Sequence, residues 1–483
     1  MTKNHLTRGA ALVAATALLS TPLVAASAAT PKLKWGACPD SAGAPRGVYC
    51  AKLLVPLDYS KPTGRQITLT LSANGSLSSP HFMLVNPGGP GASGIGTEKL
   101  VSAALPQAVA DQYSVFSFDP RGVGASTPVD CGDLTKLSPH PALPYKPANA
   151  KQEQQRVALA KKVADQCGAK AKWLLPYITT ENAARDMDRI RIALGKQKID
   201  YLGYSYGTKL GATYATMFPQ HAGRFILDSV VDPLVSTYQS GFEQNVALEQ
   251  RTQQMFSWVA ANDKTYHLGK TGQAVAKAWE RIRTRLAAKP VSGKVGKPEL
   301  DDMLASSMYT EDSWPTLLEA VTQYLKGDPE GLLSAADQLA LGVDPAQLAY
   351  NCNDKGWPRT WSRWHRDTVR SDRQAPHYAW LNTWYSAPCA FWPVGPAKAG
   401  RIGSSKVPPI LLLQGRYDGP TPLAGAQRMQ LVLPGSRLLV DAGGNHASYL
   451  FTDNPCTDVP VAKYWLTGKL PANGTCPASR PAG

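Results

Sequence analysis

The sequence predicts an α/β protein in which an inserted helical lid subdomain splits a mostly parallel, doubly wound sheet. Strand-like apolar runs alternate with helical patterns from about residue 65 to 233 and again from 408 to 450. This alternation is typical of a parallel sheet with helices on both faces. Between these two regions the patterns are mainly helical. A chain of 483 residues, 43% hydrophobic and 18% charged, is large enough for such a globular domain with an insertion.

The expected elements follow one another in order. "RQITLTLSANG", "HFMLVNPGGPG" and "YSVFSFDPRGVG" are strand-like runs, two of which lead into glycine-rich loops. "TTENAARDMDRIRIALG" predicts a helix that Thr180 caps and Gly195 ends. "IDYLGYSYGT" leads into a helix from Thr208 to about Phe218, and "RFILDSVVDP" is the next strand. After the helical stretch, "PPILLLQGRYDGPTP" and "SRLLVDAGGNHASYL" restore the alternation.

We therefore divide the chain into four parts. They are a signal peptide (1–28), the first part of the core (29–235), a helical lid insertion (236–405) and the second part of the core (406–483). Nine of the twelve tryptophans fall in the helical stretch, where they would line apolar subsites or pack in its interior. A lid over a substrate site is favoured because the candidate catalytic residues flank the insertion. A purely structural subdomain is the alternative.

The N-terminus has the pattern of a secretory signal peptide. Lys3 and Arg8 precede the apolar run "GAALVAATALLSTPLVAA", and Ala26-Ser27-Ala28 matches a cleavage site. Ser20, Thr21 and Pro22 interrupt the run, which argues against the alternative of a membrane anchor. We expect an extracellular protein without stable membrane insertion.

Eight cysteines follow the signal region, and an even number in an exported protein favours disulfides. The simplest pairing joins neighbours along the chain: Cys38–Cys50, Cys131–Cys167, Cys352–Cys389 and Cys456–Cys476. No zinc-binding motif occurs, so no metal is expected. The formal net charge is +15, but the basic residues are scattered and no nucleic-acid-binding motif appears. Nucleic acid is therefore not expected as a partner.

Ser205 is the candidate nucleophile. It lies in Gly-Tyr-Ser-Tyr-Gly directly after a strand-like run, and a nucleophile on a sharp strand-to-helix turn needs small residues at both flanking sites. A serine hydroxyl also needs a base, and the expected chain order is Ser, Asp, His. His446, in the loop after the last strand, is the candidate base. Asp418, at the end of the preceding strand, is the candidate acid, with Asp232 and Asp441 as rivals.

An oxyanion requires two backbone N–H donors. We expect one from Tyr206, directly after the nucleophile, and the other from the loop "NPGGPGASG" after an early strand. Gly89 is the preferred donor in this loop, and Gly88 is the alternative. The loop lacks the Gly-Lys-Ser/Thr of a phosphate-binding loop and does not match Gly-x-Gly-x-x-Gly.

With these motifs the chain resembles the secreted bacterial tripeptidyl aminopeptidases, which are α/β-hydrolase serine peptidases related to prolyl aminopeptidases. The resemblance rests on "NPGGPGASG", "FDPRGVGAS", "GYSYGT", "LDSVVDP", "NCND", "GRYDGPTP" and "GGNHAS" and covers most of the chain after the signal. Prolyl aminopeptidases usually have His-Gly-Gly-Pro-Gly in the oxyanion loop. Here Pro87 replaces that histidine, which suits the tripeptidyl branch.

The resemblance implies an enzyme that releases short peptides from the free N-termini of peptides or proteins and needs no cofactor. Such an enzyme has to bind an ammonium group, for which a lid carboxylate is suited. Glu243 in "GFEQN" and Asp354 in "NCNDKGW" are the candidates. A carboxylesterase or lipase with the same triad is the main alternative, and a non-catalytic binding protein on this scaffold is a second one. The oligomeric state does not follow from the sequence.

Overall fold

The computed structural model describes residues 1, 33–75, 77, 79–137, 139, 141–339, 343–398 and 400–479. The predicted signal peptide, residues 1–28, lies outside the described residues except for Met1. Residues from 33 onwards belong to one compact unit.

A single ten-stranded sheet runs through this unit in the order β1-β2-β3-β5-β4-β6-β7-β8-β9-β10. The strands from β5 to β10 in this order are parallel, and β1, β2 and β3 pair antiparallel at one edge. The mostly parallel sheet of the prediction is thus confirmed. The bounds are β1 Gly36–Ala37, β2 Val48–Pro56, β3 Gln66–Asn74, β4 His81–Asn86, β5 Tyr113–Asp119, β6 Ile199–Tyr204, β7 Ala222–Asp228, β8 Leu411–Gly415, β9 Arg437–Asp441 and β10 Gly474–Cys476.

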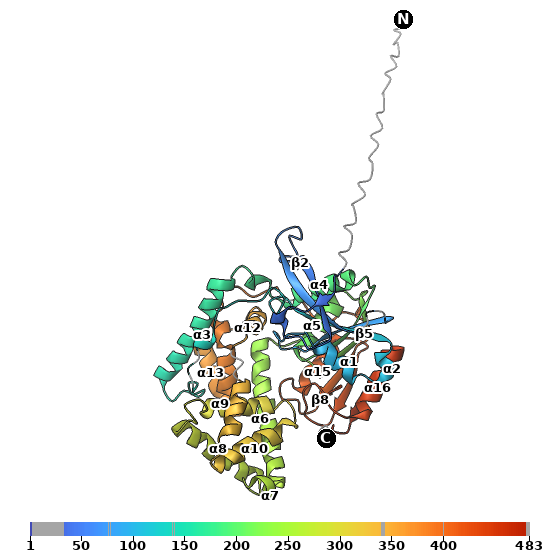
Figure 1. The fold of residues 1–483 in the computed structure, drawn as a ribbon. Coiled ribbons are helices and arrows are strands. Elements are labelled where there is room, and N and C mark those ends of the chain that lie inside the picture. Colours follow the sequence, from blue (N-terminus) through green and yellow to red (C-terminus); the bar gives the residue numbers. More distant parts are fainter. Residues whose placement is uncertain are drawn as a thin grey trace. The chain divides into compact units, whose positions relative to one another are not determined.

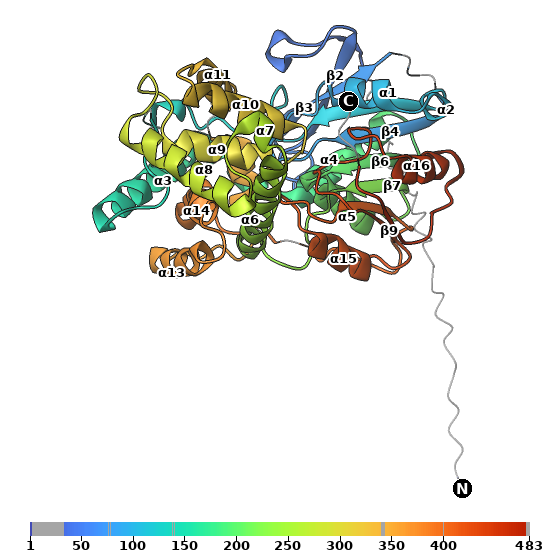
Figure 2. The ribbon, with the colours of Figure 1, turned by 90° about the horizontal axis from the view of Figure 1, so that it is seen from below.

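Two hydrophobic cores cover the two faces of the sheet, because successive side chains of a strand point to opposite faces. On β7, Phe225 and Leu227 join one core and Ile226 joins the other. Helices α4, α5 and α15 cover the first face, and α1, α2 and α16 cover the second; α1 and α15 lie on opposite sides of the strands in Figure 2. The bounds are α1 Thr97–Ala104, α2 Gln107–Ala110, α4 Thr180–Ala193, α5 Tyr206–Met217, α15 Leu423–Val432 and α16 Pro455–Thr467.

A helical insertion stands between β7 and β8, and Figure 1 shows α6, α8, α9 and α10 gathered beside the sheet. These four helices share a hydrophobic core of their own, centred on Trp279, Phe256 and Leu304. The bounds are α6 Thr237–Ala261, α7 Asp263–Tyr266, α8 Gly272–Ala288, α9 Lys297–Ser307, α10 Ser313–Leu325, α11 Glu330–Leu339, α12 Pro345–Cys352, α13 Trp361–Asp372 and α14 Ala379–Ser386, followed by the 3₁₀ helix η4 Ala387–Phe391.

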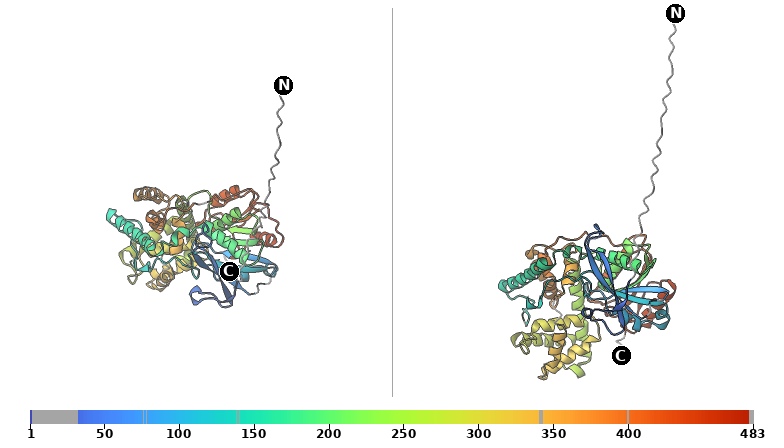
Figure 3. Two further views of the ribbon diagram at one scale, coloured as in Figure 1. Left: turned by 90° about the horizontal axis from the view of Figure 1, so that it is seen from above. Right: turned by 45° about the horizontal axis from the view of Figure 1, so that its top comes forward.

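Helix α3 (Ala150–Ala171), which the sequence analysis does not identify, precedes β6 in the chain but packs against the insertion at η4. Both views of Figure 3 show it among the inserted helices. Trp361 Nε1 donates to Glu153 Oε1 at 2.7 Å, and Tyr145, just before α3, donates through its hydroxyl to Asp302 Oδ1 at 2.7 Å. A segment from the first half of the chain thus completes the insertion.

Two predicted helix starts are wrong. Helix α4 is capped by Thr179, whose hydroxyl accepts from the N–H of Asn182, and not by Thr180. Helix α5 begins at Tyr206, two residues earlier than predicted. The turn at Ser205 is so tight that the helix starts directly after it.

The four predicted disulfides are present and use all eight cysteines: Cys38–Cys50, Cys131–Cys167, Cys352–Cys389 and Cys456–Cys476. Cys131–Cys167 ties α3 to the loop after β5, and Cys352–Cys389 ties α12 to η4. Among the helices of the described residues, none has both the length and the apolar character that a bilayer crossing needs.

A buried ion pair holds α4 against the sheet. The Arg121 guanidinium donates to both carboxylate oxygens of Asp186 at 2.6 and 2.7 Å, and neither side chain is exposed. Arg121 also donates to the carbonyl oxygens of Leu57 and Pro56, at the end of β2. The arginine of the "FDPRGVGAS" motif is therefore a structural crosslink between β2, β5 and α4.

We predict that Asp186→Asn lowers the free energy of unfolding by about 3–5 kcal/mol, because it leaves a buried guanidinium without its counter-charge. Urea denaturation followed by tryptophan fluorescence measures this change. The control is Asp165→Asn, whose partner is Lys161 and where both side chains are more than half exposed, at 59% and 58%. Its effect should stay below about 1 kcal/mol. Equal losses in the two variants would contradict the structural role of the buried pair.

Candidate active site

Ser205 occupies a strained turn between β6 and α5. Its φ is 54° and its ψ is −123°, a conformation that costs free energy in a residue with a side chain. The Ser205 N–H donates to the carbonyl oxygen of Asp228 at 2.9 Å. A Cβ on Gly203 would lie 2.6 Å from the carbonyl oxygen of Gly207, so the turn closes only with a glycine before the serine. This is the elbow geometry that the motif predicts.

The loop after β4 lies directly against this elbow. A Cβ on Gly88 would lie 2.9 Å from the Cβ of Ser205 and 3.2 Å from the nitrogen of Tyr206, and the φ of Gly88 is 103°. The Gly88 N–H donates to Asn86 Oδ1 at 3.1 Å and is therefore occupied. Among the described residues, no protein group accepts from the N–H of Gly89 or of Tyr206. The structure thus brings the two predicted oxyanion donors, Gly89 and Tyr206, beside Ser205 and leaves both N–H groups available.

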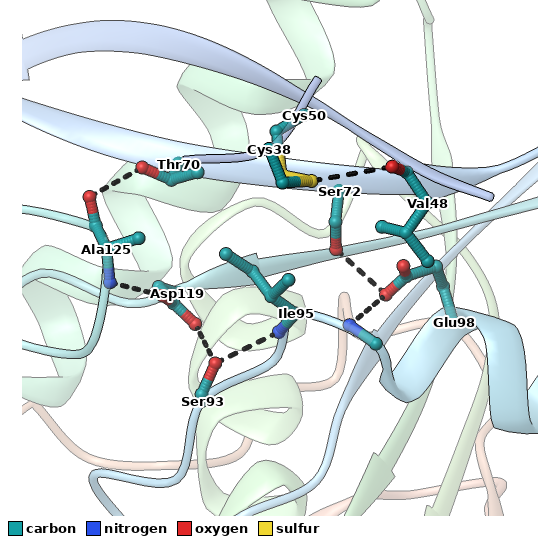
Figure 4. The surroundings of a disulfide bond; sticks show 11 residues. Cys38, Val48, Cys50, Thr70, Ser72, Ser93, Ile95, Glu98, Asp119 and Ala125 are labelled. Atoms are coloured by element: carbon teal, nitrogen blue, oxygen red, sulfur yellow. Dashed lines mark hydrogen bonds between the residues drawn. A yellow bond between two sulfur atoms is a disulfide. The ribbon is translucent and has the colours of Figure 1, made fainter. Parts of the chain in front are cut away.

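Asp119, at the end of β5, holds the far half of the same loop. Its Oδ1 accepts from the Ser93 hydroxyl at 2.6 Å and from the Gly94 N–H at 2.9 Å, and its Oδ2 accepts from the Ala125 N–H at 2.7 Å. Figure 4 shows Asp119 between Ser93 and Ala125, near the Cys38–Cys50 disulfide. One buried carboxylate therefore fixes the loop that carries Gly89.

His446 pairs with Asp418. Its Nδ1 lies 3.0 Å from each carboxylate oxygen of Asp418, which is only 1% exposed. Thr421 donates to both oxygens, through its N–H at 2.8 Å and its hydroxyl at 2.9 Å, and Gln414 Nε2 lies 3.2 Å from Oδ2. Burial lowers the pKa of His446, but the Asp418 carboxylate outweighs burial, so the pKa lies above the usual 6.5. The arrangement suits a base whose imidazolium form an acid stabilises.

The two rival acids have other partners. Asp232 forms an ion pair with Arg428 and accepts from the N–H of Leu234. Asp441 accepts from the N–H of Gly443 and from Asn454 Nδ2 at 2.7 Å. Among the three predicted acids, Asp418 is the one bonded to His446.

The loop that carries His446 is anchored on the end of β7, which the sequence analysis did not foresee. The Ala447 N–H donates to the Ser229 hydroxyl at 2.7 Å, and the Tyr449 N–H donates to Asp228 Oδ2 at 2.8 Å. Burial raises the pKa of Asp228 to about 7. The only sequence signal is the position of Asp228 and Ser229 at a strand end, which does not reveal their partners.

Tyr309, just after α9 in the insertion, also contacts the base. The backbone N–H of His446 donates to the backbone carbonyl oxygen of Tyr309 at 2.8 Å. The rings of the two residues meet edge to face, with their centroids 5.2 Å apart. Next to it, the Glu311 N–H donates to Asn445 Oδ1 at 2.9 Å. The insertion therefore touches the candidate catalytic loop directly, in a contact between residues more than 130 positions apart.

A cavity of about 550 Å³ lies between the sheet and the insertion. Gly89, Ser205 and Tyr206 form part of its wall, and the insertion supplies most of the rest. Of the six tryptophans between residues 357 and 392, Trp357 and Trp364 line the cavity. The other four serve packing: Trp361, Trp380, Trp384 and Trp392.

The two predicted amine-binding carboxylates are both engaged. Glu243 lines the cavity, but Arg428 Nη1 donates to its Oε2 at 3.0 Å. Asp354 is not among the cavity-lining residues, and its Oδ2 accepts from Lys209 Nζ at 2.5 Å and from the Thr237 hydroxyl at 2.6 Å. Position in the sequence could not reveal these partners, which lie on other elements.

Comparison with known proteins agrees with this fold. A family model described as alpha/beta hydrolase fold matches residues 82–453, so the chain is an α/β-hydrolase. It is 37% identical to the tripeptidyl aminopeptidase of Streptomyces lividans over 94% of this chain and 88% of that protein. It is 30% identical to two proteins of Mycobacterium tuberculosis: serine protease Hip1, over 92% of both chains, and carboxylesterase B, over 91% of this chain and 89% of that one.

The chain therefore belongs to the tripeptidyl aminopeptidase family of α/β-hydrolases and is a serine hydrolase, which confirms the resemblance drawn from the motifs.

We predict that activity falls with decreasing pH through a midpoint above 6.5, because the base has to be neutral and Asp418 raises the pKa of His446. Asp418→Asn removes this charge, so the midpoint should move to lower pH while kcat falls by about 10⁴. The measurement is kcat/KM against pH on an activated ester. Asp232→Asn is the control and should leave the midpoint unchanged. A midpoint that moves with Asp232 and not with Asp418 would assign the acid to Asp232.

We also predict that Gly88→Ala lowers kcat at least 100-fold, because the added methyl group would displace Ser205 or the Tyr206 N–H from the oxyanion position. Gly195→Ala is a matched control. Gly195 also has a positive φ, 69°, but no atom lies within 4 Å of an added Cβ. Steady-state kinetics with thermal denaturation separates a local effect from unfolding, and equal kinetic losses in both variants would refute the steric argument.

Proposed function

We propose that the protein is a secreted serine exopeptidase that releases short peptides, chiefly tripeptides, from free N-termini. The observation that carries the proposal is the position of Ser205 in the wall of a cavity of about 550 Å³ under the helical insertion. A space of this size admits a chain end of a few residues but not a folded polypeptide. The names of the relatives, tripeptidyl aminopeptidase and serine protease, support peptide substrates.

In the proposed mechanism, His446 takes the proton of the Ser205 hydroxyl, and the oxygen attacks the scissile carbonyl carbon. The resulting oxyanion accepts from the N–H groups of Gly89 and Tyr206. His446 then gives its proton to the leaving amine, and the C–N bond breaks. Water, deprotonated by His446, attacks the ester carbonyl, and the peptide leaves as a carboxylic acid while Ser205 regains its proton. Asp418 holds the His446 tautomer throughout.

The insertion, residues 236–405, acts in this proposal as a lid that forms the substrate subsites. Tyr238, Phe242, Trp357 and Trp364 give the cavity an apolar side suited to the side chains of a peptide. Export through the predicted signal peptide fits the four disulfides, which persist in oxidising compartments.

An esterase is the second candidate, because one relative at 30% identity is named carboxylesterase B and the same triad cleaves esters. The two candidates differ in what they require of the substrate. An exopeptidase has to recognise the terminal ammonium group, whereas an esterase does not.

The test uses three matched substrates: a tripeptide anilide with a free amine, the same compound acetylated, and a short-chain ester. We expect kcat/KM for the free-amine peptide to exceed that for the acetylated one at least 100-fold, and Ser205→Ala to lower it by about 10⁴ or more at unchanged circular dichroism. Cleavage of the ester without either peptide would establish the esterase. Full activity of Ser205→Ala would refute the proposed nucleophile.

A further inference from the structure

The proposed function requires a group that binds the substrate ammonium, and the following inference rests on that function. Three carboxylates line the cavity: Asp232, Glu243 and Asp302. Arg428 forms ion pairs with the first two, so each of these carboxylates already has a cationic partner, although they share the single charge of Arg428. Asp302 is the third.

Asp302, on α9, has no cationic partner within ion-pair distance among the described residues. Its Oδ1 accepts from the Tyr145 hydroxyl. Among the residues that the structure describes, no protein group donates to its Oδ2. The charged groups around it are Asp301 and Glu299 on α9 and Arg156 on α3.

None of these neighbours forms an ion pair with this carboxylate, although the positive charge of Arg156 lowers its pKa. Asp301 is bonded to Arg283, Glu299 accepts from the N–H of Ala142, and Arg156 donates to the Pro144 carbonyl oxygen. Burial, together with the charges of Asp301 and Glu299, raises the pKa of Asp302 to about 7 against the opposing effect of Arg156, as expected of a buried carboxylate without an ion-pair partner. A cation that enters the cavity would supply one.

The position of Asp302 on α9 also sets the distance between its carboxylate and Tyr309, which contacts His446. Asp302, Ala305 and Ser306 line the cavity from one face of α9, and Tyr309 lines it from the turn directly after this helix. Tyr309 follows Asp302 by seven positions, the first five within α9 and the last two in the turn that continues it, which corresponds to a rise of about 10 Å. Tyr309 lies on His446, so it marks the reacting end of the cavity. Three extended residues also span about 10 Å, whereas two span about 7 Å and four about 14 Å.

We propose that Asp302 binds the terminal ammonium of the substrate and that its spacing from the Tyr309–His446 contact selects three residues for release. The N-terminal segment then lies along α9, with its ammonium on Oδ2 of Asp302 and its third carbonyl at Ser205.

The test is Asp302→Asn, measured with anilides of two, three and four residues, each with a free and with an acetylated amine. We expect kcat/KM for the free-amine tripeptide to fall about 10- to 100-fold, mostly through KM, as for the loss of a charged hydrogen bond. Activity on the ester and labelling of Ser205 by a fluorophosphonate should stay unchanged, and the preference for three residues should disappear.

Two control variants separate the ammonium contact from other effects. Glu319→Gln removes an exposed carboxylate on α10 that does not line the cavity, and Glu243→Gln removes the other candidate carboxylate. Both should change kcat/KM less than threefold. If Glu243→Gln causes the loss instead, or if Asp302→Asn keeps the wild-type preference for the free amine, the assignment to Asp302 is wrong. If the wild-type enzyme does not distinguish free from acetylated peptides, the proposed function itself fails.

Discussion

The candidate active site depends on the end of strand β7, where a single dipeptide holds two loops. The Asp228 carbonyl oxygen accepts the N–H of Ser205, and the Asp228 side chain accepts the N–H of Tyr449. Ser229 accepts the N–H of Ala447. The nucleophile elbow at Ser205 and the loop of His446, 241 positions later in the chain, are therefore both hydrogen-bonded to Asp228 and Ser229. Because parallel strands end at one edge of the sheet, the end of β7 holds the Ser205 and His446 segments at the same place, and the insertion adds a hydrogen bond from the backbone N–H of His446 to Tyr309.

The insertion adds a second level of organisation. It has its own hydrophobic core, and it reaches the histidine loop through Tyr309 and Glu311. Helix α3 and the loop before it join the insertion through Glu153 and Tyr145. The sheet thus supplies the reacting groups, while the insertion, completed by a segment of the first half, supplies most of the cavity wall.

The sequence predicted what local patterns encode. The glycines beside Ser205, the apolar runs of the parallel strands and the chain order Ser, Asp, His were sufficient for the fold and the candidate triad. Helix α3 was missed because half of its buried positions are alanine, the others being Arg156, Val163 and Cys167, and these residues give little periodic signal. Thr421, Tyr309 and Asp302 were missed because their roles arise from contacts with residues on other elements. Glu243 and Asp354 were chosen by position in the sequence, and only the fold reveals their cationic partners.

The contact between Tyr309 and His446 links the entry of substrate to the orientation of the candidate base. Any movement that lifts α9 to widen the cavity has to break the hydrogen bond from the His446 N–H to Tyr309 and separate the two rings. An open molecule would then have a poorly oriented base, and a closed molecule would have a well-oriented one. Such coupling would limit reaction in the open molecule, because Ser205 would then lack a correctly oriented His446 to take its proton.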